Sequence, residues 1–492
     1  MGTYKKLTGI NFSMLFRLMG FLMIIECGFM LVPLATCLLY GEGDWVSFGY
    51  SIAITGGVGL ALTLLLRPRS TDMGKKEGFL LTALVWVVFS LFGMLPFLFG
   101  QHATTVPDAF FEAMSGFTTT GASTLTSIDS MSHGQLLWRC LMQWIGGLGI
   151  ILFTLAVIPM LNKSGGMQMF NAEVTGITHE KIRPRVSQTA KGLWVVYITL
   201  TAILIGLLWL GPMDAFESVC HAFSVMSTGG ASTSDASIGQ WNIPYVKIVL
   251  TVFMFIGGVN FSLIFRVGHG DFRGAWKNDI LKIFVGVIVV VTVFISAWAF
   301  FHGGERSVEG LLIDPLFTVV SMSTSTGYTL GVVEEWGPTV LVVIFVLIFF
   351  GGCAGSTSGG AKIDRGVVLF QHCRNEIVRC LYPNAIFAVR VNGRVVSREL
   401  ISKSVVFLAL YVMIILFGTI VITAMGVSMG HAFVATFSCI TSAGISTPEM
   451  NIDMTFVGLP SAAKWFLSFV MLVGRLELFT VLLLFTSDFW RK

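Results

Sequence analysis

A seven-residue pattern of serine, threonine and glycine occurs four times in the chain and constrains its architecture more than any other feature. The copies read TTTGAST at residues 118–124 (turn 1), STGGAST at 227–233 (turn 2), TSTGYTL at 324–330 (turn 3) and TSAGIST at 441–447 (turn 4). Every copy has glycine at its fourth position, follows a short apolar run and precedes a long one. Four similar turns in one chain predict a ring around a common axis.

The apolar runs around the turns predict helices that cross a lipid bilayer. Hydrophobic residues make up 54% of the 492 residues and charged residues 12%, with a mean hydropathy of +0.82, which excludes an ordinary soluble globular protein. A bilayer core of roughly 30 Å takes about 20 helical residues to cross. The predicted spans lie at residues 16–40, 48–66, 79–100, 136–161, 192–211, 245–265, 282–302, 338–352, 404–426 and 462–486. We therefore predict an all-α polytopic membrane protein with ten transmembrane helices.

Lysine and arginine are concentrated in alternate loops, which predicts the orientation of the helices. Basic residues in short loops stay on the cytoplasmic side of the membrane. Of the 31 basic residues, 26 fall in the segments 1–17, 67–76, 163–191, 266–282, 362–403 and 491–492. We expect both termini to be cytoplasmic and all four turns to open toward the outside. This topology accounts for the net charge of +4, so nothing indicates nucleic acid as a partner; membrane lipid is the expected surrounding.

From residue 78 onward the chain repeats a unit of long helix, short apolar helix, turn and long helix. The fourth-position glycines are separated by 109, 97 and 117 residues. The predicted parts are two extra N-terminal helices at 1–77, repeat 1 with a cytoplasmic loop at 78–191, repeat 2 at 192–280, repeat 3 at 281–403 and repeat 4 at 404–492.

The short helices of these repeats reach only halfway across a membrane. Segments such as 108–117 and 314–322 have about ten residues, at roughly 1.5 Å each. The non-helical backbone after them would cost several kcal/mol per unpaired group in lipid, so we expect it to line a protein-walled, water-filled passage. The topology points the partly negative C-terminal ends of these half-helices toward the membrane centre, which favours a cation.

The turns themselves have the composition of a cation filter. Glycine permits positive φ, and carbonyl oxygens arranged around an axis can replace the hydration shell of a potassium ion. For a single copy, an ordinary Ser/Thr-rich loop would be the better interpretation; four copies after four half-helices favour the ring. The candidate potassium-binding residues are Thr119, Thr120, Gly121, Thr228, Gly229, Gly230, Ser325, Thr326, Gly327, Ser442, Ala443 and Gly444.

A glycine-rich stretch, GGCAGSTSGGAK at 351–362, interrupts the third repeat. Such a composition does not hold a firm helix, so we expect a flexible constriction that acts as a gate, with a close-packed patch of small residues as the alternative. Nucleotide binding by this stretch is disfavoured because the ending GK[ST] and a preceding strand are absent. The candidate gate residues are Gly351, Gly352, Cys353, Ala354, Gly355, Ser356, Thr357, Ser358, Gly359 and Gly360.

The long helices after the turns share a second internal match. Its aligned first positions are Gly146, Gly257, Gly351 and Gly474, and the next positions are Gly147, Gly258, Gly352 and Arg475. A charge such as Arg475 within a span costs about 2.5 kcal/mol or more and usually faces a cavity or a partner. We expect Arg475 to face the pore axis, join the gate and slow cation passage. A structural ion pair with Glu477 or another acid is the alternative.

In these residues the chain resembles the Trk/Ktr/HKT superfamily of cation transporters, and within it the TrkH branch of bacterial potassium-uptake subunits. The resemblance covers essentially the whole chain and rests on TTTGAS, STGG, TSTGY, FFGGCAGSTSGG and GRLE. It implies four pseudo-repeats around one pore, a homodimer in the bacterial inner membrane, and gating by 351–360 with Arg475. It also implies a cytosolic regulatory subunit of the TrkA type, through which alone a nucleotide (ATP/ADP or NAD) would act; no covalent cofactor is expected.

The resemblance also bears on ion selectivity. Members with serine at the first filter glycine tend toward sodium, whereas Gly121 and its three counterparts here are all glycine, which favours potassium. Turn 2 has Gly229 and turn 4 has Ala443 where a hydroxyl residue would be usual. Because backbone carbonyls can still coordinate there, we expect selectivity with weaker discrimination against sodium.

Two other classes of function are alternatives to a channel-like potassium uptake protein. A proton- or sodium-coupled secondary symporter for potassium or sodium would use an alternating-access site with acids or histidine in the spans, for which Glu26, His221 and Glu477 are candidates. An enzyme would need clustered His, Asp, Glu or Cys, and the eight cysteines show no metal-ligand spacing. We predict no enzyme activity, and potassium uptake through a carbonyl-lined filter.

Overall fold

The computed structural model describes most of the chain. The described residues are 10–66, 74–101, 104–147, 149, 186–303, 307–330, 336–385, 387–445 and 456–491. The expected cytoplasmic segment at 163–185, the last two residues of turn 4 and the distal part of the predicted span at 136–161 lie outside them.

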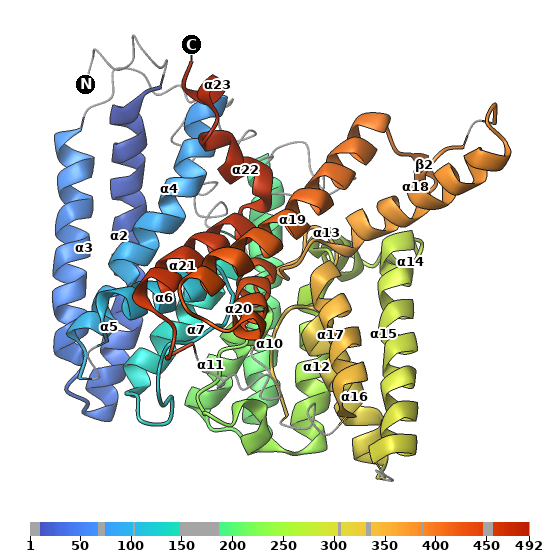
Figure 1. The fold of residues 1–492 in the computed structure, drawn as a ribbon. Helices are drawn as coiled ribbons and strands as arrows, with labels where there is room; N and C mark the ends of the chain where they lie inside the picture. The colour runs from blue at the N-terminus through green and yellow to red at the C-terminus, as the bar shows by residue number, and fades with distance from the viewer. Residues whose placement is uncertain are drawn as a thin grey trace.

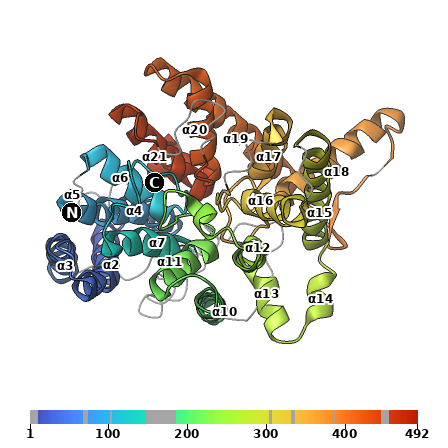
Figure 2. The ribbon, with the colours of Figure 1, turned by 90° about the horizontal axis from the view of Figure 1, so that it is seen from below.

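Two long antiparallel helices open the chain and stand beside the first repeat. They are α2 (Phe12–Tyr40) and α3 (Trp45–Leu65), which pack closely on each other and lie at the outer edge of the molecule (Figure 2). The Asn11 side chain accepts the Met14 N–H at the start of α2, and Gly41, with φ of 69°, ends it. Glu26 in α2 is fully buried, so its side chain is surrounded by protein.

Repeats 1 and 2 follow in the predicted order of helix, half-helix, turn and helix. Repeat 1 comprises α4 (Lys75–Gly93), α5 (Leu95–Phe99), α6 (Val106–Phe117) and α7 (His133–Gly147). Repeat 2 comprises α10 (Val186–Trp209), α11 (Ala215–Met226), the 3-10 turn η2 (Ser237–Trp241) and α12 (Pro244–Gly258). The connecting helices α13 (Phe261–Gly268) and α14 (Phe272–Trp276) lead to repeat 3.

Repeats 3 and 4 have the same plan with additions. Repeat 3 comprises α15 (Asp279–Trp298), the π-helical turns η3 (Ala299–Gly303) and η4 (Glu309–Ile313), α16 (Asp314–Ser323) and α17 (Pro338–Phe350). Beyond the glycine-rich stretch come α18 (Ile363–Leu381) and an antiparallel pair, β1 (Arg390–Val391) and β2 (Arg394–Val395). Repeat 4 comprises α19 (Arg398–Ala424), α20 (Met429–Thr441), α21 (Ser461–Arg475), α22 (Glu477–Leu484) and α23 (Ser487–Trp490).

The half-helices α6, α11, α16 and α20 have 12, 12, 10 and 13 residues. Capping residues and prolines mark their starts: Asp214 caps α11 by accepting the Glu217 N–H, and prolines stand at the first turns of α6 and α16. The predicted halfway reach of these helices is therefore present in all four repeats.

Helix contacts close the four repeats into a circle. The second helix of each repeat packs against the half-helix of the next: α7 on α11, α12 on α16 and, from the last repeat back to the first, α21 on α6. Between repeats 3 and 4, Phe345 of α17 packs on Phe433 and Phe437 of α20. In the view from below, the four repeats surround a common centre (Figure 2). Helix α2 begins and α23 ends at the same end of the molecule (Figure 1).

The apolar runs form helices as expected, but two of them are sharply broken. Among the described residues, six helices are long and apolar enough to cross a membrane, or eight if each bent pair counts as one span. The bent pairs are α12 with α13, at 110°, and α21 with α22, at 120°. The apolar pattern predicts continuous spans over residues 245–265 and 462–486, so the breaks differ from the prediction. The bends fall beside the aligned positions Gly258 and Arg475.

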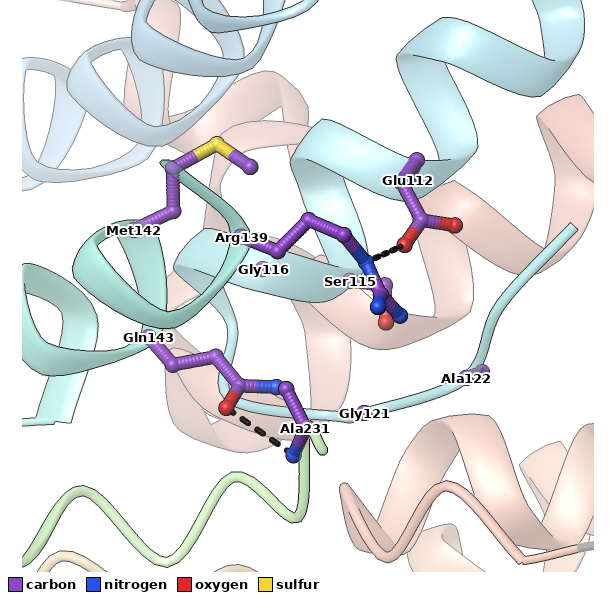
Figure 3. A pocket seen from close by; sticks show the side chains of 9 residues that line it. All are labelled: Glu112, Ser115, Gly116, Gly121, Ala122, Arg139, Met142, Gln143 and Ala231. Atoms are coloured by element: carbon purple, nitrogen blue, oxygen red, sulfur yellow. Dashed lines mark hydrogen bonds and ion pairs between the residues drawn. The ribbon is translucent and has the colours of Figure 1, made fainter. Parts of the chain in front are cut away.

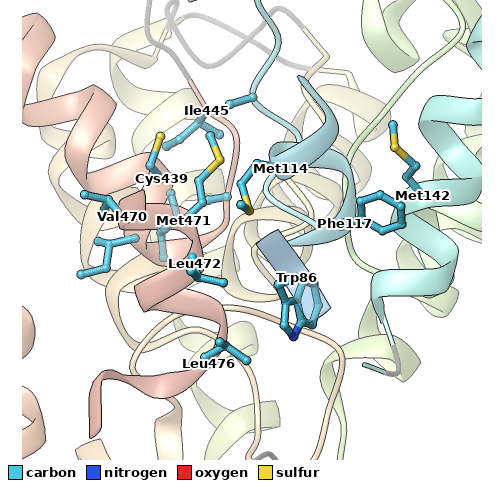
Figure 4. Close-up of a cluster of buried hydrophobic side chains, with 14 of the residues drawn as sticks. Trp86, Met114, Phe117, Met142, Cys439, Ile445, Val470, Met471, Leu472 and Leu476 are labelled. Atoms are coloured by element: carbon cyan, nitrogen blue, oxygen red, sulfur yellow. The ribbon is translucent and has the colours of Figure 1, made fainter. Parts of the chain in front are cut away.

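The interior and the outer faces are both apolar, as a membrane protein requires. Repeats 1 and 4 meet in a buried cluster in which Met114 of α6 lies beside Met471 and Leu472 of α21, next to Trp86 of α4 (Figure 4). Large apolar side chains are also exposed on the outer helices, for example Val290 at 67% and Ile420 at 66%. Such extensive exposed apolar surface is typical of contact with lipid.

Candidate ion-conducting site

Each half-helix ends in a turn whose second residue has left-handed backbone. The φ angles are 55° at Thr119, 53° at Thr228, 52° at Ser325 and 52° at Ser442. The third residue of every turn donates its N–H to the carbonyl of a serine five residues earlier. The four bonds are Thr120 to Ser115 at 2.9 Å, Gly229 to Ser224 at 2.9 Å, Thr326 to Ser321 at 2.8 Å and Ala443 to Ser438 at 3.1 Å. This pattern usually ends a helix with glycine in the left-handed position, and a side chain there costs roughly 1–2 kcal/mol. Strain of this kind gathers at functional sites.

The fourth residue of every turn is a glycine that touches the next turn. The φ angles are 79° at Gly121, 75° at Gly230, 81° at Gly327 and 60° at Gly444. A Cβ atom on these glycines would lie 2.2 Å from the Gly229 oxygen, 2.0 Å from the Thr326 oxygen, 2.1 Å from the Ala443 oxygen and 2.3 Å from the Thr120 oxygen, in that order. The contacts run from turn 1 to 2, 2 to 3, 3 to 4 and 4 back to 1. The four turns therefore form a closed ring, which brings together all twelve candidate residues.

The hydroxyl groups at the first position of the turns face their own helices. The bonds are Thr118 to the Met114 carbonyl at 2.6 Å, Ser227 to Phe223 at 2.8 Å, Thr324 to Val320 at 2.8 Å and Thr441 to Phe437 at 2.7 Å. These hydroxyls hold the first residue of each turn to its half-helix, whereas the third-position carbonyls lie at the contacts between turns.

A small polar pocket of about 10 Å³ lies behind turns 1 and 2 (Figure 3). In it, Arg139 donates from Nε to Glu112 Oε1 at 2.7 Å, and these side chains are 6% and 5% exposed. Glu112 also accepts the Ser123 hydroxyl and the Thr124 N–H, each at 3.1 Å. This buried ion pair therefore braces the end of turn 1.

The residues that support the ring were not among the candidates predicted from sequence. The four serines that receive the third-position N–H stand three residues before each turn, so extending the internal alignment by one helical turn would have found them. Gln143 of α7 contacts turn 2, and it stands alone at its aligned position, so no repeat signal marks it.

The glycine-rich stretch is non-helical, as predicted, and runs along the first residues of the turns. Cys353 donates its N–H to Gly258 O at 2.9 Å, and Thr357 donates to Gly257 O at 3.2 Å. Gly360 donates to Thr441 O at 2.9 Å. The stretch is thus pinned to repeats 2 and 4 by its backbone while it lies between the ring and helix α18.

Arg475 lies beside this stretch and binds carbonyl oxygens. Its Nη2 donates to Gly146 O at 2.6 Å and to Gly147 O at 2.8 Å, and its Nη1 donates to Thr357 O at 3.0 Å. Glu477, the acid considered as its partner, instead pairs with Arg365 at 2.5 Å. Arg475 therefore joins repeat 1, repeat 4 and the glycine-rich stretch.

The aligned glycines of the second helices permit close packing on the half-helix ends. A Cβ on Gly146 would lie 1.8 Å from Phe117 O, and one on Gly474 would lie 2.2 Å from Ile440 O. Phe117 and Ile440 each directly precede a turn. The helices α7, α12, α17 and α21 end at or one residue before these aligned pairs, so the pairs mark where the second helices break.

The groups considered for a coupled carrier have separate surroundings. Glu26 lies in α2, Glu477 pairs with Arg365, and His221 contacts Ser232 Oγ at 3.2 Å. Within the described residues, no group of three or more His, Cys, Asp or Glu could hold a metal ion.

Comparisons with known proteins agree with this architecture. The family model described as "TrkH: Cation transport protein" matches residues 48–270 and 280–492. The Trk system potassium uptake protein TrkH of Escherichia coli (strain K12) is 35% identical over 487 residues, covering 98% of this chain and 100% of the relative. The Trk system potassium uptake protein TrkI of Halomonas elongata is 31% identical, covering 97% and 96%.

A solved structure matches over the same length. The crystal structure of the potassium transporter TrkH from Vibrio parahaemolyticus superposes with a TM-score of 0.88 at 30% identity, covering 98% of this chain and 100% of that chain. The match extends to the two N-terminal helices as well as to the four repeats.

Proposed function

Because the chain belongs to the TrkH family of cation transport proteins, we propose that it takes up potassium ions through the ring of turns 1 to 4. The closed order of the four glycine contacts supports this proposal most directly, since it sets main-chain oxygens from all repeats around one centre. Such oxygens replace the hydration shell of a monovalent cation. Full-length relatives named as potassium uptake proteins favour potassium as the ion.

In the proposed mechanism, potassium enters from outside and loses water among the turn carbonyls. The C-terminal ends of four half-helices add partial negative charge there. The membrane potential contributes about 2.3 kcal/mol per charge per 100 mV to inward movement. No bond is made or broken, so transport requires no catalytic group.

Gly121→Ser tests the ring. The side chain would meet the Gly229 oxygen, because a Cβ at this position lies 2.2 Å from it. We expect sodium to enter more readily relative to potassium, measured as uptake of both ions by cells that lack their own potassium uptake systems. Gly206→Ser in α10 is the matched control, since nothing lies within 4 Å of its Cβ position. An unchanged ion preference in Gly121→Ser would count against the ring.

We further propose that residues 351–360 and Arg475 form the gate. The support is their position, since Thr357 contacts both Gly257 O and Arg475 next to the first residues of the turns. A fixed positive charge beside a cation path raises the barrier to permeation. Displacing the stretch would also break its backbone hydrogen bonds to Gly258 and Thr441. These hydrogen bonds therefore stabilise the closed state of the proposed gate.

Arg475→Gln and Arg475→Lys separate charge from hydrogen bonding. If charge sets the rate, Gln should speed uptake while Lys stays close to wild type. Lys lacks the planar fork that serves several carbonyls at once, so fast uptake by both variants would indicate that the hydrogen bonds hold the gate. Potassium uptake per protein in liposomes is the measurement, with protein amount checked in each preparation.

A coupled potassium or sodium symporter is the second candidate. The buried Glu26, whose two carboxyl oxygens have no hydrogen-bond partner among the described residues, favours it, because intramembrane acids often mark proton paths. Resolvable single-molecule currents from the purified protein would exclude a carrier. Uptake that depends on a proton or sodium gradient, without such currents, would support one.

We also propose that the protein acts as a homodimer with a cytosolic regulatory subunit of the TrkA type. The relatives are named as parts of a Trk system. Helix α18 extends away from the body (Figure 1) and exposes Phe370 at 75% and Ile377 at 70%. Co-purification with a candidate subunit, with and without Phe370→Asp, would test α18 as its docking element.

A further inference from the structure

Gln143 lies at the seam between turns 1 and 2. This α7 side chain is 2% exposed. Its Nε2 donates to the Gly229 carbonyl at 2.9 Å, and its Oε1 accepts from the Ser224 hydroxyl at 2.9 Å and from the Ala231 N–H at 3.2 Å. The amide therefore reaches from repeat 1 into turn 2 of the neighbouring repeat (Figure 3).

The carbonyl that Gln143 binds belongs to the ring. Gly229 O is the oxygen that Gly121 touches where turn 1 meets turn 2. A carbonyl has two lone pairs, so one can accept the Gln143 amide while the other faces a cation. The corresponding oxygens of Thr120, Thr326 and Ala443 accept no hydrogen bond in the part of the chain that the structure describes. Of these four ring carbonyls, only that of Gly229 is held by a side-chain hydrogen bond among the described residues.

Gln143 also accounts for the missing side chain at Gly229. Turns 1 and 3 have threonine at this position, with Thr120 and Thr326 bonded to the first hydroxyl of their own turns at 2.8 and 2.7 Å. A Cβ on Gly229 would lie 2.4 Å from Gln143 Cδ. Gly229 is not among the residues with positive φ, so occupied space alone excludes a side chain there.

The other repeats lack this support. The positions aligned with Gln143, three residues before the first aligned glycine, hold Met254, Ile348 and Met471. Repeat 1 therefore supplies an amide where the others supply an apolar side chain, and turn 2 has exchanged its own hydroxyl for it.

We infer that Gln143 is a positioning residue that sets the discrimination among monovalent cations, acting through the carbonyl of Gly229. The inference rests on the proposed function of the ring. Carbonyl orientation decides how closely the oxygens approach an ion, and losing one hydrogen bond typically changes an equilibrium about two- to tenfold.

Gln143→Met tests the hydrogen bond, because methionine already occupies this place in repeats 2 and 4. We expect the ratio of potassium to sodium affinity, measured as KM for each ion in liposomes, to fall about two- to tenfold. Gln135→Met is the control on the same helix, since this glutamine is also buried but lies against Gly100. Its ion ratio should match wild type.

A double-mutant cycle tests whether the Gln143 side chain occupies the space that a side chain at position 229 would need. Gly229→Thr alone should abolish uptake, because its Cβ would collide with Gln143. Gln143→Ala with Gly229→Thr should restore part of the uptake, since the alanine frees the volume and turn 2 then matches turns 1 and 3. No recovery in the double variant, when it is present in the membrane at wild-type amount, would overturn the coupling.

The outcomes separate this inference from the function beneath it. If Gly121→Ser changes the ion ratio and Gln143→Met does not, Gln143 has no role in selectivity while the ring stands. If neither changes it, the ring is not the filter. If Gln143→Met is not found in the membrane, the double-mutant cycle decides whether Gln143 acts on Gly229. Recovery of uptake in the double variant supports this coupling, and no recovery overturns it.

Discussion

Within each turn, the second and fourth residues share a left-handed backbone but face different surroundings. Thr119 and Gly121 have φ of 55° and 79°. The Thr119 hydroxyl has no hydrogen-bond partner among the described residues, whereas the Cβ position of Gly121 lies 2.2 Å from the next turn. The second position thus tolerates a side chain at a conformational cost, and the fourth excludes one by contact.

This contrast predicts that alanine at the two positions changes thermal stability by different amounts. Thr119→Ala keeps the same backbone strain and removes a hydroxyl without a partner, so thermal stability in detergent should change little. Gly121→Ala adds left-handed strain of about 1–2 kcal/mol and a collision with Gly229, so the unfolding midpoint should fall clearly. Equal midpoints for the two variants would show that the ring is looser than its contacts indicate.

At the scale of elements, two buried lysines tie the second helix of one repeat to the half-helix of the next. Lys247 of α12 binds Asp314 of α16 at 2.5 Å, and Lys464 of α21 binds Asp108 of α6. Each lysine stands ten residues before its aligned glycine, and each aspartate ten residues before its turn. These ion pairs therefore join repeat 2 to repeat 3 and repeat 4 to repeat 1. They occur at alternate contacts around the circle of four repeats.

Lys464→Leu tests such a tie, because leucine occupies the matching positions in repeats 1 and 3. Removing one partner of a largely buried pair leaves the other charge uncompensated, at a cost of about 3–5 kcal/mol. The thermal midpoint should drop, and Lys464→Leu with Asp108→Asn should recover part of it. Lys403→Leu, which breaks an exposed pair with Glu399, is the control and should have no measurable effect.

At the scale of the whole molecule, the apolar outer faces are suited to contact lipid, and the alternate basic loops predict an orientation in the membrane. Exposed apolar side chains, such as Val290 of α15 in repeat 3 and Ile420 of α19 in repeat 4, lie on the outer surface. Helix α18 leaves this body and carries basic residues together with the two exposed cysteines, Cys373 and Cys380. These cysteines are natural reporters of orientation.

The predicted topology places Cys373 and Cys380 in the cytoplasm. A membrane-impermeant maleimide should therefore label inverted membrane vesicles but not intact cells, with the remaining cysteines buried or half-buried. Cys373→Ser with Cys380→Ser should abolish the labelling. Labelling of intact cells would reverse the orientation and place the turns on the inside.

Several features of the site could be predicted because they are local and repeated. Half-helix, turn and fourth-position glycine are encoded within about 20 consecutive residues, and four copies made the pattern visible. The candidate residues 119–121 and their counterparts do lie together in one ring. The breaks of α12 and α21 were missed, because a broken and a straight helix have the same apolar composition.

The sequence by itself determined that four equivalent turns exist, that glycine is needed at their fourth positions, and that the chain lies in a membrane. Only the tertiary structure decided which turn touches which, that Arg475 binds carbonyls while Glu477 pairs with Arg365, and that Gln143 occupies the space beside Gly229. These are contacts between segments about 80 to 330 residues apart. Local composition sets backbone conformation, whereas such partners depend on how the repeats close around their centre.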